Sequence, residues 1–235
     1  MQELKSYGKI TSGSEILVQG FMAKVYLWMA LGLCTTGLIA YYTSSSEQIL
    51  YMLLGKSRLP FFILLGAEIG IVLYLSSRIT TLNPATANTL FFVYAALNGL
   101  TLAPIFLVYT QESISSAFFS AAATFGAMSA YGTLTKRDLS GLGSFLQMGV
   151  IGLLIALLIN MFVGNSKADL VISIMGVLIF TGLTVFDTQK LRRLSQELSF
   201  REEEQSNLSI LGALTLYLDF INMFLFLLRI LGRRK

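Results

Sequence analysis

Two aspartates on consecutive apolar segments are the residues of this sequence best placed to do chemistry. Asp187 stands where an apolar run passes into polar and basic residues, in FTGLTVFDTQKLRRL, and Asp219 stands in the middle of the last apolar run, in TLYLDFINMF. A carboxylate in a hydrocarbon span is unfavourable and marks an ion or proton pathway by default. If the two side chains are neighbours, they titrate as one pair in two macroscopic steps. The pair therefore predicts a proton-sensitive site.

Other residue types with metal or redox chemistry are scarce. The chain has no histidine and a single cysteine, Cys34. Any pH sensing near neutrality must therefore come from carboxylates, and an intramolecular disulfide or a zinc cluster is excluded. We expect no resident cofactor and no enzyme activity. Two carboxylates, Asn222 and water offer calcium, a cation that prefers oxygen ligands, a weak and transient site. Protons and calcium would compete for the same oxygens.

Helical spacing places each aspartate on a face with particular neighbours. On the last segment the face consists of Thr215, Asp219 and Asn222, at positions i, i+4 and i+7. On the segment before it, the face consists of Gly176, Phe180, Thr184 and Asp187. A polar stripe on a helix in lipid faces the bundle interior or a cavity. The alternative is that each carboxylate is a hydrogen-bonding strut between helices, and this alternative is strongest for Glu68, which stands alone on its apolar segment.

Composition predicts an all-α integral membrane protein. Of 235 residues, 54% are apolar and 13% are charged, whereas soluble domains carry about 25% charged residues. The 17 basic residues against 13 acidic ones fit the loop charge that orients a membrane protein, and we expect no nucleic-acid partner. We expect residues 1–20 to form a polar cytoplasmic tail and residues 21–235 a single transmembrane domain.

The long apolar blocks predict seven membrane spans, with six spans and one re-entrant segment as the alternative. The predicted spans are 21–42, 59–78, 89–109, 114–135, 145–163, 170–189 and 208–231. The fourth is rich in Ser, Ala and Gly, which favours a place inside the bundle. Residues 44–58 are expected to form a loop whose apolar part lies along the membrane surface. The spacing of Leu191, Leu194 and Leu198 indicates that the sixth helix continues past the membrane.

Basic residues favour a cytoplasmic N-terminus. In this orientation ten Lys and Arg residues lie on the cytoplasmic side and three lie in the opposite loops. The four basic residues of the C-terminal segment reduce this difference, because they add to the outer side; they are Arg229, Arg233, Arg234 and Lys235.

The same orientation predicts the depth of the charged residues. Arg78 and Asp187 fall at one cytoplasmic level, and Glu68 lies about 15 Å deeper at 1.5 Å per residue. Counted from the predicted start of its span, Asp219 falls at the depth of Glu68. A direct pair of aspartates therefore requires that the last span begin lower or that the helix before it shift.

Three long segments are specific enough to indicate a family. They are FGAMSAYGTLTKRDLSGLGSFLQMGVIGLL, GVLIFTGLTVFDTQKL and SILGALTLYLDFINMFLFLLRILG. From Phe21 onward the chain resembles the bacterial branch of the Bax-inhibitor family of transmembrane proteins. The resemblance implies a seven-helix bundle in the inner membrane, with a cytoplasmic N-terminus and a central last helix. It also implies a pH-sensitive calcium leak gated by an aspartate pair matching Asp187 and Asp219, with Arg78 as the basic residue that latches it.

Two other functions remain open. The chain could be an interaction protein that modulates proteolysis or stress responses, with a membrane protease or other membrane proteins as partners. It could also be an intramembrane aspartyl protease, which uses two aspartates on neighbouring helices. The GxGD sequence of such proteases is absent, since Leu216, Tyr217 and Leu218 precede Asp219.

Overall fold

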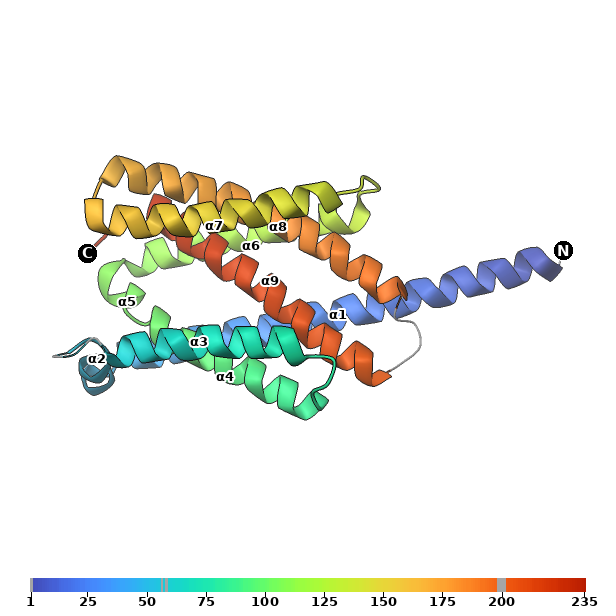
Figure 1. Cartoon of the computed structure of the whole chain (residues 1–235), viewed down its shortest axis with the longest axis horizontal. Coiled ribbons are helices and arrows are strands. Elements are labelled where there is room, and N and C mark those ends of the chain that lie inside the picture. Colours follow the sequence, from blue (N-terminus) through green and yellow to red (C-terminus); the bar gives the residue numbers. More distant parts are fainter. Residues whose placement is uncertain (1, 56, 58, 198–201) are drawn as a thin grey trace. The chain divides into compact units, whose positions relative to one another are not determined.

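The chain is helical throughout the part that the structure describes. A computed structural model describes residues 2–55, 57, 59–197 and 202–235, and this part contains no strand beyond an isolated bridge between Tyr109 and Arg234. Figure 1 shows the helices in chain order. They are α1 (Gln2–Ser44), α2 (Glu47–Leu54), α3 (Leu59–Arg78), α4 (Pro84–Leu102), α5 (Ile105–Val108), α6 (Gln111–Leu134), α7 (Ser140–Val163), α8 (Ser166–Glu197) and α9 (Glu202–Leu231).

Six helical segments among the described residues are long and apolar enough to cross a membrane. They are Leu17–Ser44, Leu59–Arg78, Pro84–Val108, Ser140–Val163, Ser166–Gln196 and Glu204–Leu231. Helix α6 is long enough, with 24 residues, but its many Ser, Ala and Gly residues make it less apolar than these six segments. Large apolar side chains are exposed along several of the six, among them Phe162 at 84% and Phe62 at 64%, as expected of surfaces that contact lipid tails.

Helix boundaries differ from the predicted ones at three places. Residues 2–20, predicted as a polar tail, are helical, because α1 begins at Gln2, and the candidate span within α1 begins at Leu17. Within the predicted loop 44–58, residues Glu47–Leu54 form α2, and the Ser46 side chain caps its first turn by accepting from the amide of Ile49. The third span begins at Pro84 and not at Thr89, because Asn83 accepts a hydrogen bond from the Ala85 amide and caps the helix. Proline is favoured at the first helical position, where its missing N–H is not needed.

The described chain divides into two compact units, which are treated separately. The first comprises residues 1–105 and 191–214, and the second comprises 106–190 and 215–235. In the first unit α1 packs along α4. The Thr36 hydroxyl donates to the Ala95 carbonyl at 2.8 Å, and a Cβ at Gly99 would lie 2.8 Å from the carbonyl oxygen of Thr36. A glycine is therefore required for this close contact.

In the second unit α8 lies between α6, α7 and the latter part of α9. A Cβ at Gly132 of α6 would lie 2.5 Å from the Val185 carbonyl oxygen of α8, so the two backbones are nearly in contact. Helix α7 runs beside α8 (Figure 1), with Gly149 packed against Ile179. Against α9, Phe180 of α8 stacks on Phe226 with ring centroids 6.0 Å apart. These close contacts give the site described below a fixed frame.

Candidate functional site

Asp187 and Asp219 lie next to each other in the second unit. Helix α8 carries the first and helix α9 the second, and their carboxyl groups share a hydrogen bond. Such a bond requires a proton on one of the two groups. Their side chains are 9% and 4% exposed. Oδ2 of Asp219 is buried without a hydrogen-bond partner among the described residues, which leaves one acceptor of the pair open to a proton or a cation.

The face of α8 predicted from helical spacing is the face that contacts α9. A Cβ at Gly176 would lie 2.5 Å from the Phe226 ring, so the absence of a side chain there admits that ring. One turn later Phe180 stacks on the same ring. Thr184 is fully buried, and its hydroxyl donates to the Phe180 carbonyl at 2.8 Å. The aspartate pair thus continues a packed seam between two antiparallel helices.

The depth estimate that separated the two aspartates is wrong, because the last helix begins earlier than predicted. Helix α9 begins at Glu202, before the predicted start at Leu208, and α8 continues to Glu197. More residues of α9 therefore precede Asp219 than the prediction assumed. The predicted continuation of the sixth helix is confirmed for Leu191 and Leu194, whereas Leu198 lies outside the described residues.

The two residues after Asp187 attach this part of α8 to neighbouring segments of the second unit. The hydroxyls of Thr188 and Ser129 share a hydrogen bond of 3.1 Å, and both residues are buried. The Gln189 amide donates to the Arg137 carbonyl at 2.8 Å and accepts from the Leu139 amide at 3.2 Å. The segment around Arg137 is thus held to the helix turn that carries Asp187. Sequence analysis missed these partners, although the polar Asp-Thr-Gln triplet at the end of an apolar run signals them.

Glu68 has the environment of a hydrogen-bonding strut. It lies on α3 in the first unit and is 7% exposed. Asn98 of α4 donates to it at 3.3 Å, and the Thr101 hydroxyl donates to its other oxygen. Both carboxyl oxygens therefore have a donor, which favours a role in joining α3 to α4.

The remaining predicted site residues are placed as follows. Thr215 is half-buried one turn before Asp219, and Asn222 is half-buried one turn after it. The Asn222 amide donates to the Leu218 carbonyl of its own helix at 2.8 Å, so its amide oxygen is the atom suited to a cation. Arg78 is exposed at the end of α3. It belongs to the first unit and the aspartates to the second, so its role as a latch stays a prediction.

The pair supplies few of the ligands that a metal ion takes. Within the described part of the chain, no three His, Cys, Asp or Glu residues come together in a geometry that could hold a metal ion. Calcium takes six to eight oxygen ligands. A calcium ion at Asp187 and Asp219 would therefore need water or other oxygen atoms to complete its shell.

Comparison with known proteins identifies the family. Residues 18–235 match the family described as "Inhibitor of apoptosis-promoting Bax1". The chain belongs to the Bax inhibitor family. Over 221 residues it is 45% identical to the "Inner membrane protein YbhL" of Escherichia coli (strain K12), with 93% of each chain covered. An uncharacterized protein of Borreliella burgdorferi is 41% identical over 222 residues, covering 94% of this chain and 95% of that one. The uncharacterized protein RP147 of Rickettsia prowazekii is 44% identical over 215 residues, covering 92% and 90%.

Family and structure together make this chain a membrane protein. One relative is named as an inner membrane protein, and six helical segments of the described part have the length and hydropathy of membrane spans. The apolar faces of these helices contact the lipid bilayer, and the aspartate pair is buried away from them.

Proposed function

We propose that this protein is a pH-sensitive calcium leak channel or transporter of the bacterial inner membrane. In this proposal Asp187 and Asp219 form both the proton-sensing group and the narrowest part of the ion pathway. The observation that carries the proposal is the direct contact of two buried carboxyl groups on neighbouring helices. One oxygen of Asp219 has no hydrogen-bond partner among the described residues and is therefore free to bind an ion. This supports the proposal, because conduction requires a binding site that an ion can enter and leave.

One proton decides the state of the pair. With a proton shared, the hydrogen bond joins α8 and α9 at this level. When the proton leaves, two like charges face each other in a low-dielectric environment, which is strongly unfavourable. A divalent cation relieves the repulsion, and so does separation of the two helices. Calcium and protons therefore act on the same oxygens, and the flux of one depends on the concentration of the other.

The proposed architecture has seven spans in a single transmembrane domain from residue 21 onward, with the N-terminus in the cytoplasm. Helix α6 supplies the seventh span, since 24 residues rise about 36 Å and its small side chains suit a helix surrounded by others. Helix α9 takes the central position. Within the described part, 67% of its most apolar window is buried, against at most 39% for the other five spans.

Calcium flux into liposomes that contain the purified protein tests the proposal. Flux should appear with wild-type protein and change between about pH 5 and 8, a range above the ordinary pKa of a carboxyl group. Empty liposomes and liposomes with the double variant Asp187→Asn, Asp219→Asn are the controls. Absence of flux at every pH would contradict the channel, and a role as an interaction protein in membrane proteolysis or stress responses would then be favoured.

The contact of two aspartates also allows a second chemistry. Aspartyl proteases within membranes use such a pair to activate water, although the GxGD sequence is absent before Asp219. Incubation of the same protein with a transmembrane substrate distinguishes the two functions. Cleavage that is lost in Asp219→Asn, without calcium flux, would replace the proposed leak by proteolysis.

A further inference from the structure

A recess of about 610 Å³ lies in the second unit where α7 ends, α8 begins and α9 ends. Its charged wall consists of Arg229, Arg234 and Asp169, and its apolar wall includes Leu158 and Met161. Neither aspartate of the candidate ion pathway lines it. The recess is therefore distinct from that pathway.

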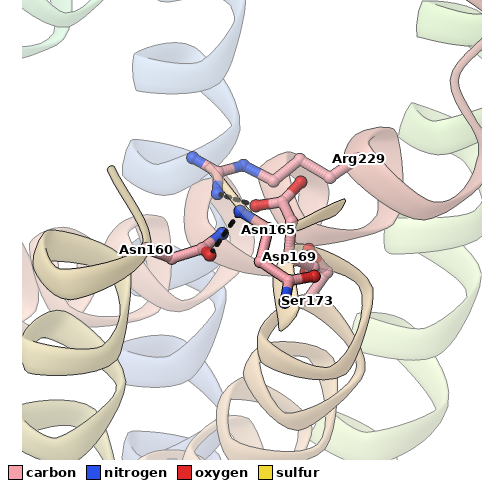
Figure 2. A network of polar contacts seen from close by, with 5 residues as sticks. All are labelled: Asn160, Asn165, Asp169, Ser173 and Arg229. Atoms are coloured by element: carbon pink, nitrogen blue, oxygen red, sulfur yellow. Dashed lines mark hydrogen bonds and ion pairs between the residues drawn. The ribbon is translucent and has the colours of Figure 1, made fainter. Parts of the chain in front are cut away.

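Short-range hydrogen bonds fix one side of the recess (Figure 2). Gly164 follows the last residue of α7, and its positive φ of 68° favours glycine. Asn165 then caps α8 by accepting from the amides of Lys167 and Ala168, at 2.9 and 3.3 Å. The side chain of Asn160 accepts from the Asn165 amide at 3.2 Å. The turn is thereby held in one conformation.

Arg229 has spare hydrogen-bonding capacity at this site. Its Nη1 contacts Oδ1 of Asp169 (Figure 2), at a distance of 3.4 Å. The two side chains are 40% and 38% exposed. Its guanidinium lies over the Phe226 ring, 5.7 Å from the ring centroid, and this cation–π contact orients the side chain. One long contact uses one of the five guanidinium donors. No other hydrogen bond of this guanidinium occurs within the described part of the chain, so its remaining donors can bind an anionic ligand.

Arg234 is held at the recess by backbone pairing. The Lys235 amide donates to the Val108 carbonyl at 2.9 Å, and the Thr110 amide donates to the Arg233 carbonyl at 3.2 Å. These bonds flank the bridge between Tyr109 and Arg234. Residues 233–235 are thus paired with residues 108–110 through their backbones, and this pairing holds Arg234 in place. Two arginines against one aspartate leave the recess with a net positive charge.

The surroundings of the recess are those of a membrane surface. Next to it, the last turns of α7 expose Leu158 at 58%, Met161 at 68% and Phe162 at 84%. Exposed side chains of this size on a membrane-spanning helix contact lipid tails. The recess therefore has a cationic wall and a lipid-facing apolar wall, and it lies where α7 and α9 end and α8 begins.

We propose that this recess binds an anionic phospholipid of the phosphatidylglycerol type, in the leaflet at this end of the bundle. The guanidinium groups of Arg229 and Arg234 bind the headgroup phosphate, for which arginine offers several N–H donors in a planar fork. An acyl chain lies along Leu158 and Met161. This binding gives two residues of the basic C-terminal cluster, Arg229 and Arg234, a role other than orienting the chain, although the cluster opposes the charge bias of the loops.

Lipid retention tests the proposal on purified full-length protein. Native mass spectrometry counts phosphatidylglycerol and phosphatidylcholine carried by the protein from mixed micelles. Wild type should retain phosphatidylglycerol preferentially, and Arg229→Gln with Arg234→Gln should reduce this retention by about tenfold or more, since charge-assisted hydrogen bonds are lost. Arg233→Gln is the matched control, because this arginine is adjacent in sequence but does not line the recess. Equal retention of both lipids by wild type, or unchanged retention in the double variant, would overturn the proposal.

Asp169→Asn separates lipid binding from a purely structural role of the ion pair. It removes the negative charge that faces Arg229 and so raises the net positive charge of the recess. Retention of phosphatidylglycerol should therefore stay or increase, and a loss like that of the arginine variants would overturn the proposal. A second experiment compares the rise in melting temperature caused by inorganic phosphate with that caused by phosphatidylglycerol. An equal rise with phosphate alone would show that the site binds a soluble anion and would refute the proposed lipid binding.

Discussion

Asp219 and Glu68 show two ways to bury a carboxyl group. Asn98 and Thr101 donate to Glu68, which is what a structural strut requires. Asp219 instead contacts a second carboxyl group and keeps a buried oxygen without a partner among the described residues. An unsatisfied buried acceptor costs about 1–3 kcal/mol of stability. Such a cost is expected where a group must take up and release a proton or an ion.

The pair predicts non-additive substitutions. Asn keeps the size of Asp but cannot ionise, so either Asp187→Asn or Asp219→Asn removes the shared proton. Each single variant should lose the response of calcium flux to pH between about 5 and 8, and the double variant should lose little more. Contacting residues show such coupling in a double-mutant cycle. Additive losses, or a normal response in either single variant, would show that the two carboxyl groups act separately.

Glu68→Gln is the matched control for that cycle. This substitution also removes a buried carboxyl group from a span. That carboxyl group, however, accepts hydrogen bonds from two donors and lies in the first unit, whereas the aspartates lie in the second. We expect a stability loss of about 1–3 kcal/mol, because an amide N–H faces one of the donors, with the pH response retained. Thermal unfolding and flux are measured on the same preparation. If calcium flux no longer responded to pH in this variant, Glu68 would belong to the ion pathway and not act only as a strut.

Arg78 is predicted to latch the pair through Asp187. If it does, Arg78→Ala leaves the aspartate charge without its partner, which is strongly unfavourable at a poorly hydrated site. Resting calcium flux should rise and its pH dependence should weaken, whereas Arg78→Lys should retain much of the wild-type behaviour. If both variants match wild type, Arg78 acts only as a basic residue at a helix end.

At the scale of helices, the contact between α6 and α8 is what holds Asp187 in position. The backbones meet at Gly132 and Val185, and one turn away Ser129 bonds to Thr188. A helix held this tightly moves as a body together with its neighbour. Displacement of α8 at the aspartate pair must therefore shift α6 or break these bonds.

Gly132→Ala tests this contact. The new Cβ would lie 2.5 Å from the Val185 carbonyl oxygen, so α8 must shift, and overpacking of this kind costs about 1–3 kcal/mol. We expect a lower melting temperature and an altered calcium flux. Gly126→Ala on the same helix is the control, since nothing lies within 4 Å of its Cβ, and the gain in helix propensity should make it neutral or stabilising. Equal behaviour of the two variants would disprove the close contact.

The sequence predicted faces better than lengths. Helical periodicity alone placed Phe180, Thr184 and Asp187 on the side of α8 that meets α9, because a 3.6-residue repeat determines which side chains share a face. It did not predict that α9 begins at Glu202, since polar residues outside the membrane carry no hydropathy signal. The register of the two helices depends on that start. The polar Asp-Thr-Gln triplet signals that Gln189 has hydrogen-bond partners, but it does not identify them, because they are backbone groups of Arg137 and Leu139.

At the scale of the whole molecule, the distribution of charge depends on whether α6 crosses the membrane. With seven spans and a cytoplasmic N-terminus, ten basic residues lie inside and seven outside. If α6 is re-entrant, every later loop changes side, and the count becomes nine against eight. The first arrangement retains a bias toward the cytoplasm and the second has almost none. The positive-inside rule therefore favours seven spans.

Topology reporters decide between these arrangements. With seven spans, a reporter fused after Lys136 should be cytoplasmic and one fused near Ser166 should be external. Single cysteines in a Cys34→Ser background provide an independent measurement, because Cys34 is the only native cysteine. Gln111→Cys and Lys136→Cys flank α6, so a membrane-impermeant reagent should label only Gln111→Cys in intact cells. Labelling of both would make α6 re-entrant and reverse the side of every later loop. The level shared by Arg78 and Asp187 would then be lost, and with it the latch.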